Sequence, residues 1–363
     1  MDELGGPGGE RNRGMWKRLI AAAAVVALAA LMLSGCSSGG GKQTLTVITH
    51  DSFNISKPLL EQFEKDNNVT VKLVPKGDAG QMLASLILTK SNPEGDVAFG
   101  VDNTFLSRAL NAGIFEKYTS PELKNVPQDL QAETDGYVTP VDYGYVNFNY
   151  DIAWFQKHNL QPPQTLEDLA KPEYKGLTVV ENPGSSSPGL CLLVATVGYF
   201  GPDHYLDWWT AMRANGMKVV DSWDTAYNVN FTLHGGAQPI VLSYATSTAY
   251  EQMAAKPPRN DSPTGNILPP KGAFKQIEYV GILKGTKHEA LAKKWIDFEL
   301  SVAAQEDEPG QMAVYPVVSG AKVPEAFTKF STVDPSAAAN VSAADIAKNR
   351  DAWIAAWTKA VLQ

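Results

Sequence analysis

The sequence predicts an α/β protein of two lobes, with a hinge of two long strands and a ligand cleft between the lobes. Three observations favour this fold class. Strand-like and helix-like segments alternate from residue 44 onward, which is typical of a sheet covered by helices. Two long strand-like runs lie far apart in the chain. The chain has 363 residues, which is long enough for two domains.

The two long runs occupy residues 138–151 and 273–285, and in both of them apolar or aromatic residues alternate with polar ones. This period of two is typical of strands whose faces meet different surroundings. In the first run, Tyr143, Tyr145 and Tyr150 come close to the carboxylate of Asp142. Two such strands could run side by side and connect two lobes. The pattern also fits core strands of one large domain, so that alternative stays open.

The composition limits the classes of function. The chain is 44% hydrophobic and 19% charged, and its formal net charge is -8. This acidity argues against nucleic acid as a partner, because phosphate backbones are bound by a surplus of Lys and Arg. The two cysteines, Cys36 and Cys191, form no Cys-x-x-Cys motif, which argues against zinc and dithiol chemistry. Cys191 stands in an apolar stretch and is expected to be a small buried side chain.

Residues 1–36 are predicted to be a signal peptide. Lys17 and Arg18 precede an apolar run at residues 19–33, and small residues follow the run. The run is short for a permanent membrane span, which needs about 20 residues, although an N-terminal anchor helix is the alternative. Acidic residues before Met15 are unusual in a signal peptide, so we expect translation to begin at Met15.

Residues 33–36, at the end of the apolar run, resemble the bacterial lipobox. This resemblance implies cleavage before Cys36 and acylation of its thiol. The protein would then lie at the outer face of the cytoplasmic membrane, held by its lipid anchor, or in the periplasm. Residues 37–43 begin with a Ser- and Gly-rich stretch and are predicted to be a flexible tether.

From residue 44 the strands and helices follow in order. Strands are predicted at residues 44–50, 69–74 and 96–101, and helices at residues 58–65, around Met82 and at residues 104–112. This alternation predicts a parallel sheet with helices on both faces, in which ligands bind beyond the carboxyl ends of the strands. The residues expected at this rim are His50, Asp51, Ser52, Asp78, Asp102 and Asn103.

The alternation continues after the first long run. Thr165 is placed to cap a helix, and further strands are predicted at residues 177–180 and at residues 218–223, which end at Trp223. Residues 239–243 form another strand that runs into a helix through hydroxyl and aromatic side chains, namely Tyr244, Thr246, Ser247 and Tyr250. The helix at residues 289–300 and the C-terminal helix are amphipathic, and the latter is expected to serve packing.

A Ser- and Gly-rich loop at residues 182–189 leads from a strand into a helix. Free backbone N–H groups and hydroxyls at such a helix start suit an anion. The alternative is a plain capped turn, since Ser and Gly are common turn residues.

Catalytic motifs are absent from the chain after residue 43, whereas aromatic residues gather at the rim. The phosphate-loop motif does not occur, and Gly-x-Ser-x-Gly occurs only at residues 35–39, within the predicted signal peptide and tether. Of the scattered histidines only His50 falls at the rim. Aromatic faces beside carboxylates such as Asp78 and Asp142 attract flat or cationic ligands. The aromatic residues concerned are Tyr143, Tyr145, Trp223, Tyr244 and Tyr250.

Several short motifs carry a resemblance to a known family. They occupy residues 49–53, 100–103, 141–145, 186–190, 222–227, 242–250 and 315–317. In order and spacing they resemble the thiamine-binding lipoproteins and periplasmic proteins of ATP-binding-cassette importers, a branch of the type II solute-binding proteins. The resemblance runs from about residue 45 to the end of the chain.

The resemblance implies a type II periplasmic-binding-protein fold that closes on thiamine, thiamine monophosphate or thiamine diphosphate and passes it to a membrane permease. The implied lobes are residues 44–140 with 275–330, and residues 141–274 with 331–363. Asp78 would lie near the organic part of the ligand, and Trp223 and Tyr250 would help to form an aromatic cage. The phosphate or hydroxyethyl end would meet Ser186, Ser187, Tyr244, Thr246 and Ser247, while the rim adds His50, Asp142 and Tyr143.

This chain departs from the family pattern at three places. His50 stands where the family often has Tyr, Ala79 stands where it has Gly, and residues 312–314 replace an expected Trp. The ligand could therefore be another cationic amine, a pyrimidine precursor or ferric ion. A pyrimidine-biosynthesis enzyme of the same fold is a further alternative, although the export signal argues against it. We expect a monomeric capture protein with no enzymatic activity, cofactor, metal or nucleic-acid partner.

Overall fold

The computed structural model describes residues 42–131 and 134–363. The predicted signal peptide at residues 1–36, the predicted acylation site Cys36 and most of the tether at residues 37–43 lie outside the described residues. Residues 44–363 form one compact unit. Within the described ranges, none of the helices is both long enough and apolar enough to span a membrane.

A single sheet of 11 strands runs through the described residues, in the order β2-β1-β3-β10-β5-β8-β6-β7 with three short strands beside this path. Its strands are β1 (Gln43–Thr49), β2 (Val69–Pro75), β3 (Val97–Asp102), β4 (Phe115–Glu116), β5 (Thr139–Asp151), β6 (Thr178–Glu181), β7 (Lys218–Val220), β8 (Ile240–Tyr244), β9 (Thr264–Ile267), β10 (Phe274–Leu283) and β11 (Tyr315–Pro316).

Helices cover this sheet. They are α2 (Lys57–Asn67), α3 (Ala79–Leu88), α4 (Leu106–Ala112), α5 (Ile152–Lys157), α6 (Leu166–Leu169), α7 (Ser187–Phe200), α8 (Tyr205–Ala214), α9 (Ser247–Ala254), α10 (Glu289–Glu299), α11 (Val302–Gln311), α12 (Glu325–Phe330) and α13 (Ala343–Val361). The predicted cap of α6 is confirmed, because the Thr165 hydroxyl accepts the backbone N–H of Asp168 at 3.1 Å.

The sheet is mixed, whereas the sequence predicted a parallel one. β1 and β3 pair in parallel, as do β6 with β7 and β8, but β10 is antiparallel to both β3 and β5. A helical crossover returns the chain to the same end of a sheet and produces parallel pairs. The long strands β5 and β10 instead carry the chain in opposite directions through the middle of the sheet, so they pair antiparallel.

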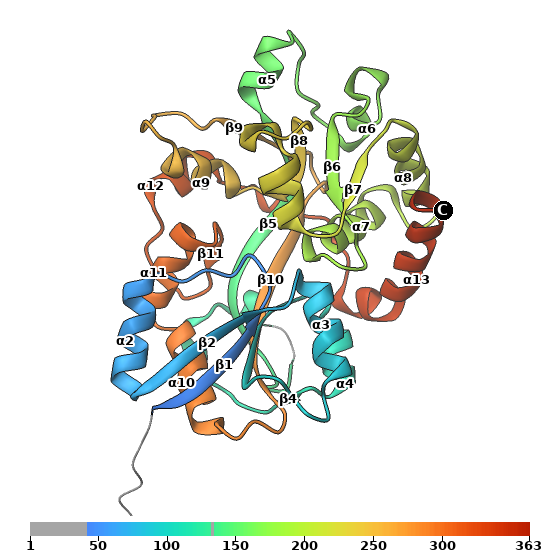
Figure 1. Cartoon of the computed structure of the whole chain (residues 1–363). Coiled ribbons are helices and arrows are strands. Elements are labelled where there is room, and N and C mark those ends of the chain that lie inside the picture. The colour runs from blue at the N-terminus through green and yellow to red at the C-terminus, as the bar shows by residue number, and fades with distance from the viewer. Residues whose placement is uncertain (1–41, 132–133) are drawn as a thin grey trace, which may run out of the picture. The chain divides into compact units, whose positions relative to one another are not determined.

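The prediction that the two long runs lie side by side is confirmed. β5 and β10 pair from Val146 opposite Phe274 to Thr139 opposite Val280, with one shift of register between Glu278 and Tyr279. In Figure 1 they pass between one group of elements that includes α2, α3 and α10 and another that includes α7, α8 and α9. The residue boundaries of two separate lobes stay a prediction.

The helices next to this sheet are held by buried aromatic residues. On α10, Trp295 is fully buried and meets the ring of Phe63 from α2 edge-on, with ring centroids 5.0 Å apart. On α13, Trp357 is fully buried against Trp209 of α8, at 5.6 Å and 89°. The C-terminal helix therefore serves packing, as its amphipathic pattern predicts. Such pairs add specific geometry to the burial of large apolar side chains.

Helix α10 ends at a buried carboxyl group. The Glu299 side chain is 3% exposed, and its Oε1 atom has no hydrogen-bond partner among the described residues. Burial disfavours the charged carboxylate and raises the pKa of Glu299 to about 8. The folded protein thus holds a proton on Glu299 at neutral pH.

We expect Glu299→Gln to flatten the pH dependence of stability. Between pH 4.5, the ordinary pKa, and pH about 8, the folded protein keeps a proton on Glu299 that the unfolded chain loses. The free energy of unfolding therefore falls as pH rises through this window. In urea denaturation the variant should match the wild type at pH 4 and exceed it at pH 8.5 by on the order of 5 kcal/mol.

Glu289→Gln, at the exposed start of the same helix, is the control and should follow the wild type at both pH values. Parallel pH profiles for the wild type and Glu299→Gln would contradict this account of Glu299.

Candidate ligand-binding site

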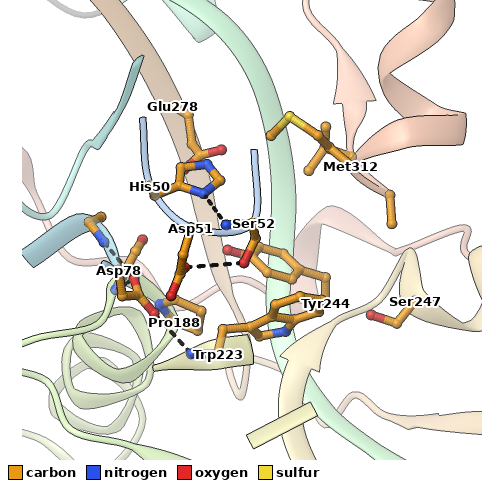
Figure 2. Close-up of a pocket in the computed structure, with 14 residues that line it drawn as sticks. His50, Asp51, Ser52, Asp78, Pro188, Trp223, Tyr244, Ser247, Glu278 and Met312 are labelled. Carbon is orange, nitrogen blue, oxygen red and sulfur yellow. Dashed lines mark hydrogen bonds and ion pairs between the residues drawn. The ribbon is translucent and has the colours of Figure 1, made fainter. Parts of the chain in front are cut away.

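A cavity lies where the end of β1 meets the first residues of α3 and α7 (Figure 2). The cavity opens to solvent, and the space between its walls, open solvent included, is about 520 Å³. The residues that line it come from widely separated parts of the chain: His50, Asp51, Ser52, Asp78, Ala79, Ser187, Pro188, Trp223, Tyr244, Ser247, Glu278, Met312, Ala313 and Val314.

Six residues of the predicted ligand set line this cavity, namely His50, Asp78, Ser187, Trp223, Tyr244 and Ser247. Their positions span almost 200 residues of sequence, so tertiary folding brings them together. The predicted rim contributes Asp51 and Ser52 as well. The other five predicted residues are not among the lining residues: Ser186, Thr246, Tyr250, Asp142 and Tyr143.

Local geometry explains most of these five positions. Ser186 and Thr246 are the N-caps of α7 and α9, and their hydroxyls are buried without a hydrogen-bond partner in the described structure. Tyr143 stacks on Tyr315 at 5.3 Å and 23°. Asp142 precedes Tyr143 in β5, so its side chain lies on the other face of the strand, where it is fully buried. Tyr250 lies half-buried in α9.

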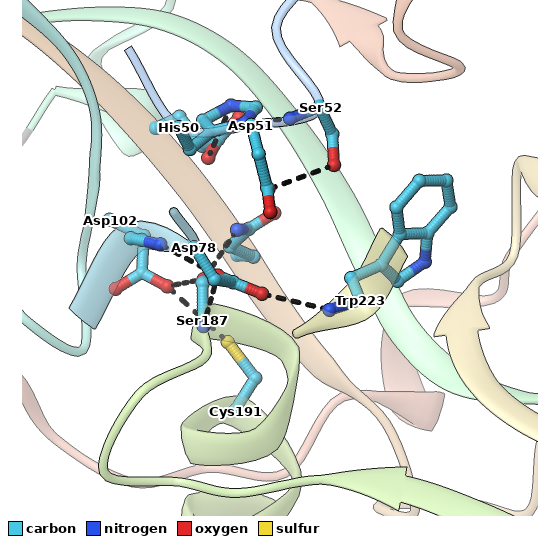
Figure 3. A network of polar contacts seen from close by, with 11 residues as sticks. His50, Asp51, Ser52, Asp78, Asp102, Ser187, Cys191 and Trp223 are labelled. Carbon is cyan, nitrogen blue, oxygen red and sulfur yellow. Dashed lines mark hydrogen bonds and ion pairs between the residues drawn. The ribbon is translucent and has the colours of Figure 1, made fainter. Parts of the chain in front are cut away.

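The Asp78 carboxylate joins three segments of the chain (Figure 3). Its Oδ1 atom accepts the backbone N–H groups of Ala79 at 2.7 Å and Ser187 at 3.1 Å, and Oδ2 accepts that of Trp223 at 2.9 Å. Burial raises the pKa of Asp78, and these N–H bonds oppose the shift. The start of α7, which the sequence marks as an anion site, is thus occupied by a carboxylate of the same chain.

Close backbone packing supports this junction. The N–H groups of Gly80 and Gln81 donate to the carbonyl of Ser185 at 2.9 and 3.2 Å. A Cβ atom on Gly80 would lie only 2.7 Å from that carbonyl oxygen. The first turn of α3 can therefore approach the loop before α7 only because residue 80 is glycine.

The Ser187 hydroxyl belongs to a buried polar network. It donates to Oδ2 of Asp102 and accepts from Nε2 of Gln276, the latter at 2.7 Å. The other Asp102 oxygen accepts the hydroxyl of Thr104 at 2.6 Å, and the Cys191 thiol lies 3.7 Å from Oδ2 (Figure 3). Cys191 is fully buried, as expected from its apolar context. Asp102 is therefore a structural residue behind the cavity.

His50 and Glu278 face each other at the cavity (Figure 2). Nδ1 of His50 accepts the backbone N–H of Ser52 at 3.2 Å, so the neutral ring carries its proton on Nε2. Nε2 lies 3.6 Å from Oε1 of Glu278, which is close enough for an ion pair but too far for a hydrogen bond. Burial opposes the imidazolium, but the nearby carboxylates, Glu278 foremost, outweigh it and raise the pKa of His50.

Trp223 provides an aromatic wall that is fixed from behind. Its indole N–H donates to the Ser243 hydroxyl at 2.8 Å, and Ser243 shares a hydrogen bond of 2.9 Å with Ser247. The indole also stacks on Tyr227 at 4.9 Å and 16°, and the Tyr227 hydroxyl donates to Glu251. An aromatic face held in this way is pre-organised to stack on a flat ligand.

Sequence reasoning did not include Glu278 among the ligand residues. The alternating pattern of the second long strand includes a carboxylate at position 278. Its side chain faces the cavity because of the way β10 pairs with β5 in the sheet. Pro188 and residues 312–314 also line the cavity without having been predicted to bind ligand. Among residues 42–131 and 134–363, no three His, Cys, Asp or Glu side chains are placed to hold a metal ion.

Comparison with known proteins identifies the group to which this arrangement is related. Residues 92–349 match the family model described as bacterial extracellular solute-binding protein. The thiamine-binding periplasmic protein of Escherichia coli (strain K12) is 31% identical over 326 residues, which cover 88% of this chain and 94% of that protein.

Solved structures agree on the architecture. A periplasmic thiamin binding protein superposes with a TM-score of 0.77 at 31% identity, covering 89% of this chain and 98% of that one. A ferric binding protein from Campylobacter jejuni superposes with a TM-score of 0.70 at 19% identity, covering 87% and 99%, which shows likeness of fold alone. The predicted type II periplasmic-binding-protein fold is confirmed by this likeness.

Proposed function

The chain belongs to the bacterial extracellular solute-binding proteins, and on that premise we propose that it captures thiamine for an ATP-binding-cassette importer. The observation that carries the proposal is the convergence of Trp223, Tyr244 and three carboxylates on one cavity. The carboxylates are Asp51, Asp78 and Glu278. Thiamine is a flat, permanently charged cation, and aromatic faces beside carboxylates favour such a ligand.

The polar groups of the cavity are arranged in a way that suits binding a ligand without reacting with it. Ser52 is the hydroxyl residue next to His50, but the histidine nitrogen contacts the Ser52 backbone N–H rather than its hydroxyl. The hydroxyl instead lies 3.4 Å from Asp51. A nucleophile needs its base within hydrogen-bond reach of the reacting atom. This arrangement supports binding followed by release of an unchanged ligand.

Unphosphorylated thiamine is the preferred form in our proposal. The start of α7 already receives the Asp78 carboxylate, so a phosphate would have to displace it. The lining also carries three carboxyl side chains and no Lys or Arg, which disfavours an added anion. Thiamine monophosphate and thiamine diphosphate should therefore bind more weakly. Another cationic amine or a pyrimidine precursor shares parts of this chemistry, whereas no described cluster of ligands favours ferric ion.

Lobe closure is the proposed means of capture. We assign residues 44–140 and 275–330 to one lobe and residues 141–274 and 331–363 to the other. The Asp78 bonds to Ser187 and Trp223 then cross between the lobes beside the cavity. The paired strands β5 and β10 would supply the hinge.

Thermal unfolding with added ligand tests the proposed function. Thiamine at about 100 times its dissociation constant should add roughly 2.7 kcal/mol to the free energy of unfolding. Thiamine monophosphate and diphosphate should give progressively smaller shifts at equal concentration. No shift with any of the three compounds would contradict thiamine capture and leave only the family membership.

Two matched tryptophan variants locate the site. Trp223→Ala removes the wall of the cavity and should weaken thiamine binding by at least about tenfold, since stacking and cation–π contacts are each worth about 1–2 kcal/mol. Trp154→Ala, on α5, removes a ring that stacks on His158 and is not among the cavity residues. It should bind as the wild type does. Equal affinities for both variants would place the ligand elsewhere.

A lipid anchor at Cys36 completes the proposal, supported by the lipobox-like residues 33–36. We expect Cys36→Ser to move the protein from the membrane fraction to the soluble extracytoplasmic fraction, because the thiol that carries the acyl groups is lost. Fractionation followed by mass spectrometry of the mature N-terminus checks this. Cys191→Ser, which changes the other cysteine, should leave the location unchanged. Retention of Cys36→Ser on the membrane after removal of residues 1–35, as shown by the mass of its N-terminus, would exclude acyl anchoring.

A further inference from the structure

Three carboxyl side chains form a row across the central strands of the sheet. Glu278 on β10 lies directly opposite Asp142 on β5 and Asp102 on β3. All three are buried, and Asp102 and Asp142 are fully so. Side chains that face each other across antiparallel strands lie about 5 Å apart, and like charges at such positions destabilise the pair. This set of Asp102, Glu278 and Asp142 is called the carboxyl row below.

The members of the carboxyl row differ in their partners. Asp102 accepts hydrogen bonds from Thr104, Phe105 and Ser187, so its charge is compensated by donors. Both Asp142 oxygens are buried and receive no hydrogen bond within the described structure. Of the three, only Glu278 is a lining residue of the cavity.

The Glu278–Asp142 pair requires compensation. Two buried carboxyl groups side by side cannot both ionise unless a proton or a positive charge is shared between them. Burial, reinforced by the neighbouring Glu278, raises the pKa of Asp142 well above its usual range. His50 can form an ion pair with Glu278, at 3.6 Å, whereas no donor reaches either oxygen of Asp142 among the described residues. The group that compensates Asp142 in the absence of ligand is therefore a proton.

We propose that Glu278 selects a positively charged organic ligand, and that the bound cation displaces the proton that Asp142 otherwise holds beside Glu278. The proposal rests on the proposed function and assigns the charge selection of that same cavity to one residue. The charge balance is complete, because one cation enters and one proton leaves to the solvent. An organic cation is specified, because the described acidic residues are not placed to bind a metal ion.

Most of the other charged groups around the row are acidic: Asp51 after β1, Asp78 before α3, Glu299 of α10 and Glu308 of α11. His50 gains charge on acidification, and Arg350 of α13 stays positive at every pH considered. Acidification neutralises the carboxyls and charges His50, and both changes weaken the attraction for a cation. Affinity for thiamine should therefore fall as pH falls, whereas affinity for an uncharged ligand of the same shape should change little.

Calorimetric titration with two ligands tests the selection. The ligands are thiamine and an uncharged analogue in which a thiophene ring replaces the thiazolium. The wild type should prefer thiamine by at least about tenfold, as expected for a contact with a buried charge. Glu278→Gln keeps the shape of the side chain and should reduce this preference to near unity while still binding the analogue. Unchanged preference in Glu278→Gln would overturn the proposal.

Glu61→Gln is the matched control, since Glu61 is exposed on α2 and pairs only with Lys57 at the surface. It should keep the wild-type preference for thiamine. Loss of preference in both variants would show a general charge effect and would also overturn the role of Glu278.

Proton counting tests the exchange. The same titrations at pH 7, in buffers of low and high ionisation enthalpy, should show that thiamine releases about one proton from the wild type. The analogue should release none, and neither should thiamine with Glu278→Gln. Thiamine binding to the wild type without proton release would overturn the exchange.

The protonation of the carboxyl row can be tested even if the proposed function is wrong. If the wild type binds neither ligand, thiamine capture is wrong, and the row is examined directly by nuclear magnetic resonance of carboxyl carbons over a pH series. A proton on Asp142 should persist to neutral pH, and its signal should vanish in Asp142→Asn. Full ionisation of Asp142 below about pH 5 in the wild type would overturn the inference.

Discussion

The Asp78 carboxylate is the interaction on which the site depends. It holds the start of α3, the start of α7 and the Trp223 segment through three backbone N–H bonds. A buried carboxylate is costly unless such donors surround it, so the three segments are fixed in one arrangement. Glycine at position 80 is needed for the same reason, because the two backbones lie too close for a side chain. The cavity exists because this junction brings its walls together.

The two buried carboxyl groups at this cavity, Asp78 and Glu278, differ in how their charge is compensated. Asp78 is saturated by backbone donors, whereas Glu278 meets only a distant imidazole and an uncompensated neighbour, Asp142. Two carboxylates that line one cavity therefore have different roles. The Asp78 carboxylate is structural, because its oxygens already accept backbone hydrogen bonds. The Glu278 carboxyl can still accept a hydrogen bond or an ion pair from a ligand. Burial alone would not separate them, since both are almost completely buried.

The positions at which this chain departs from the thiamine-binding pattern meet at the same cavity. His50 and residues 312–314 line it, as does Ala79. Gly100 makes room for the imidazole, because a Cβ atom there would lie 2.3 Å from the ring. The ring in turn faces Glu278. His in place of Tyr at position 50 would add a titratable group to the site, whereas residues 312–314 in place of Trp would remove an aromatic side chain from it.

The sequence by itself determined the order of strands and helices, the cap at Thr165 and the strand ends where the cavity lies, because periodicity and capping are local properties. Which hydroxyl or carboxyl faces the ligand depended on tertiary structure. Ser187 reaches the cavity while its neighbour Ser186 is buried at the helix cap, and Asp142 is hidden while Glu278 is not. Helix phase and strand pairing decide such choices, and both are set by contacts between residues far apart in the chain.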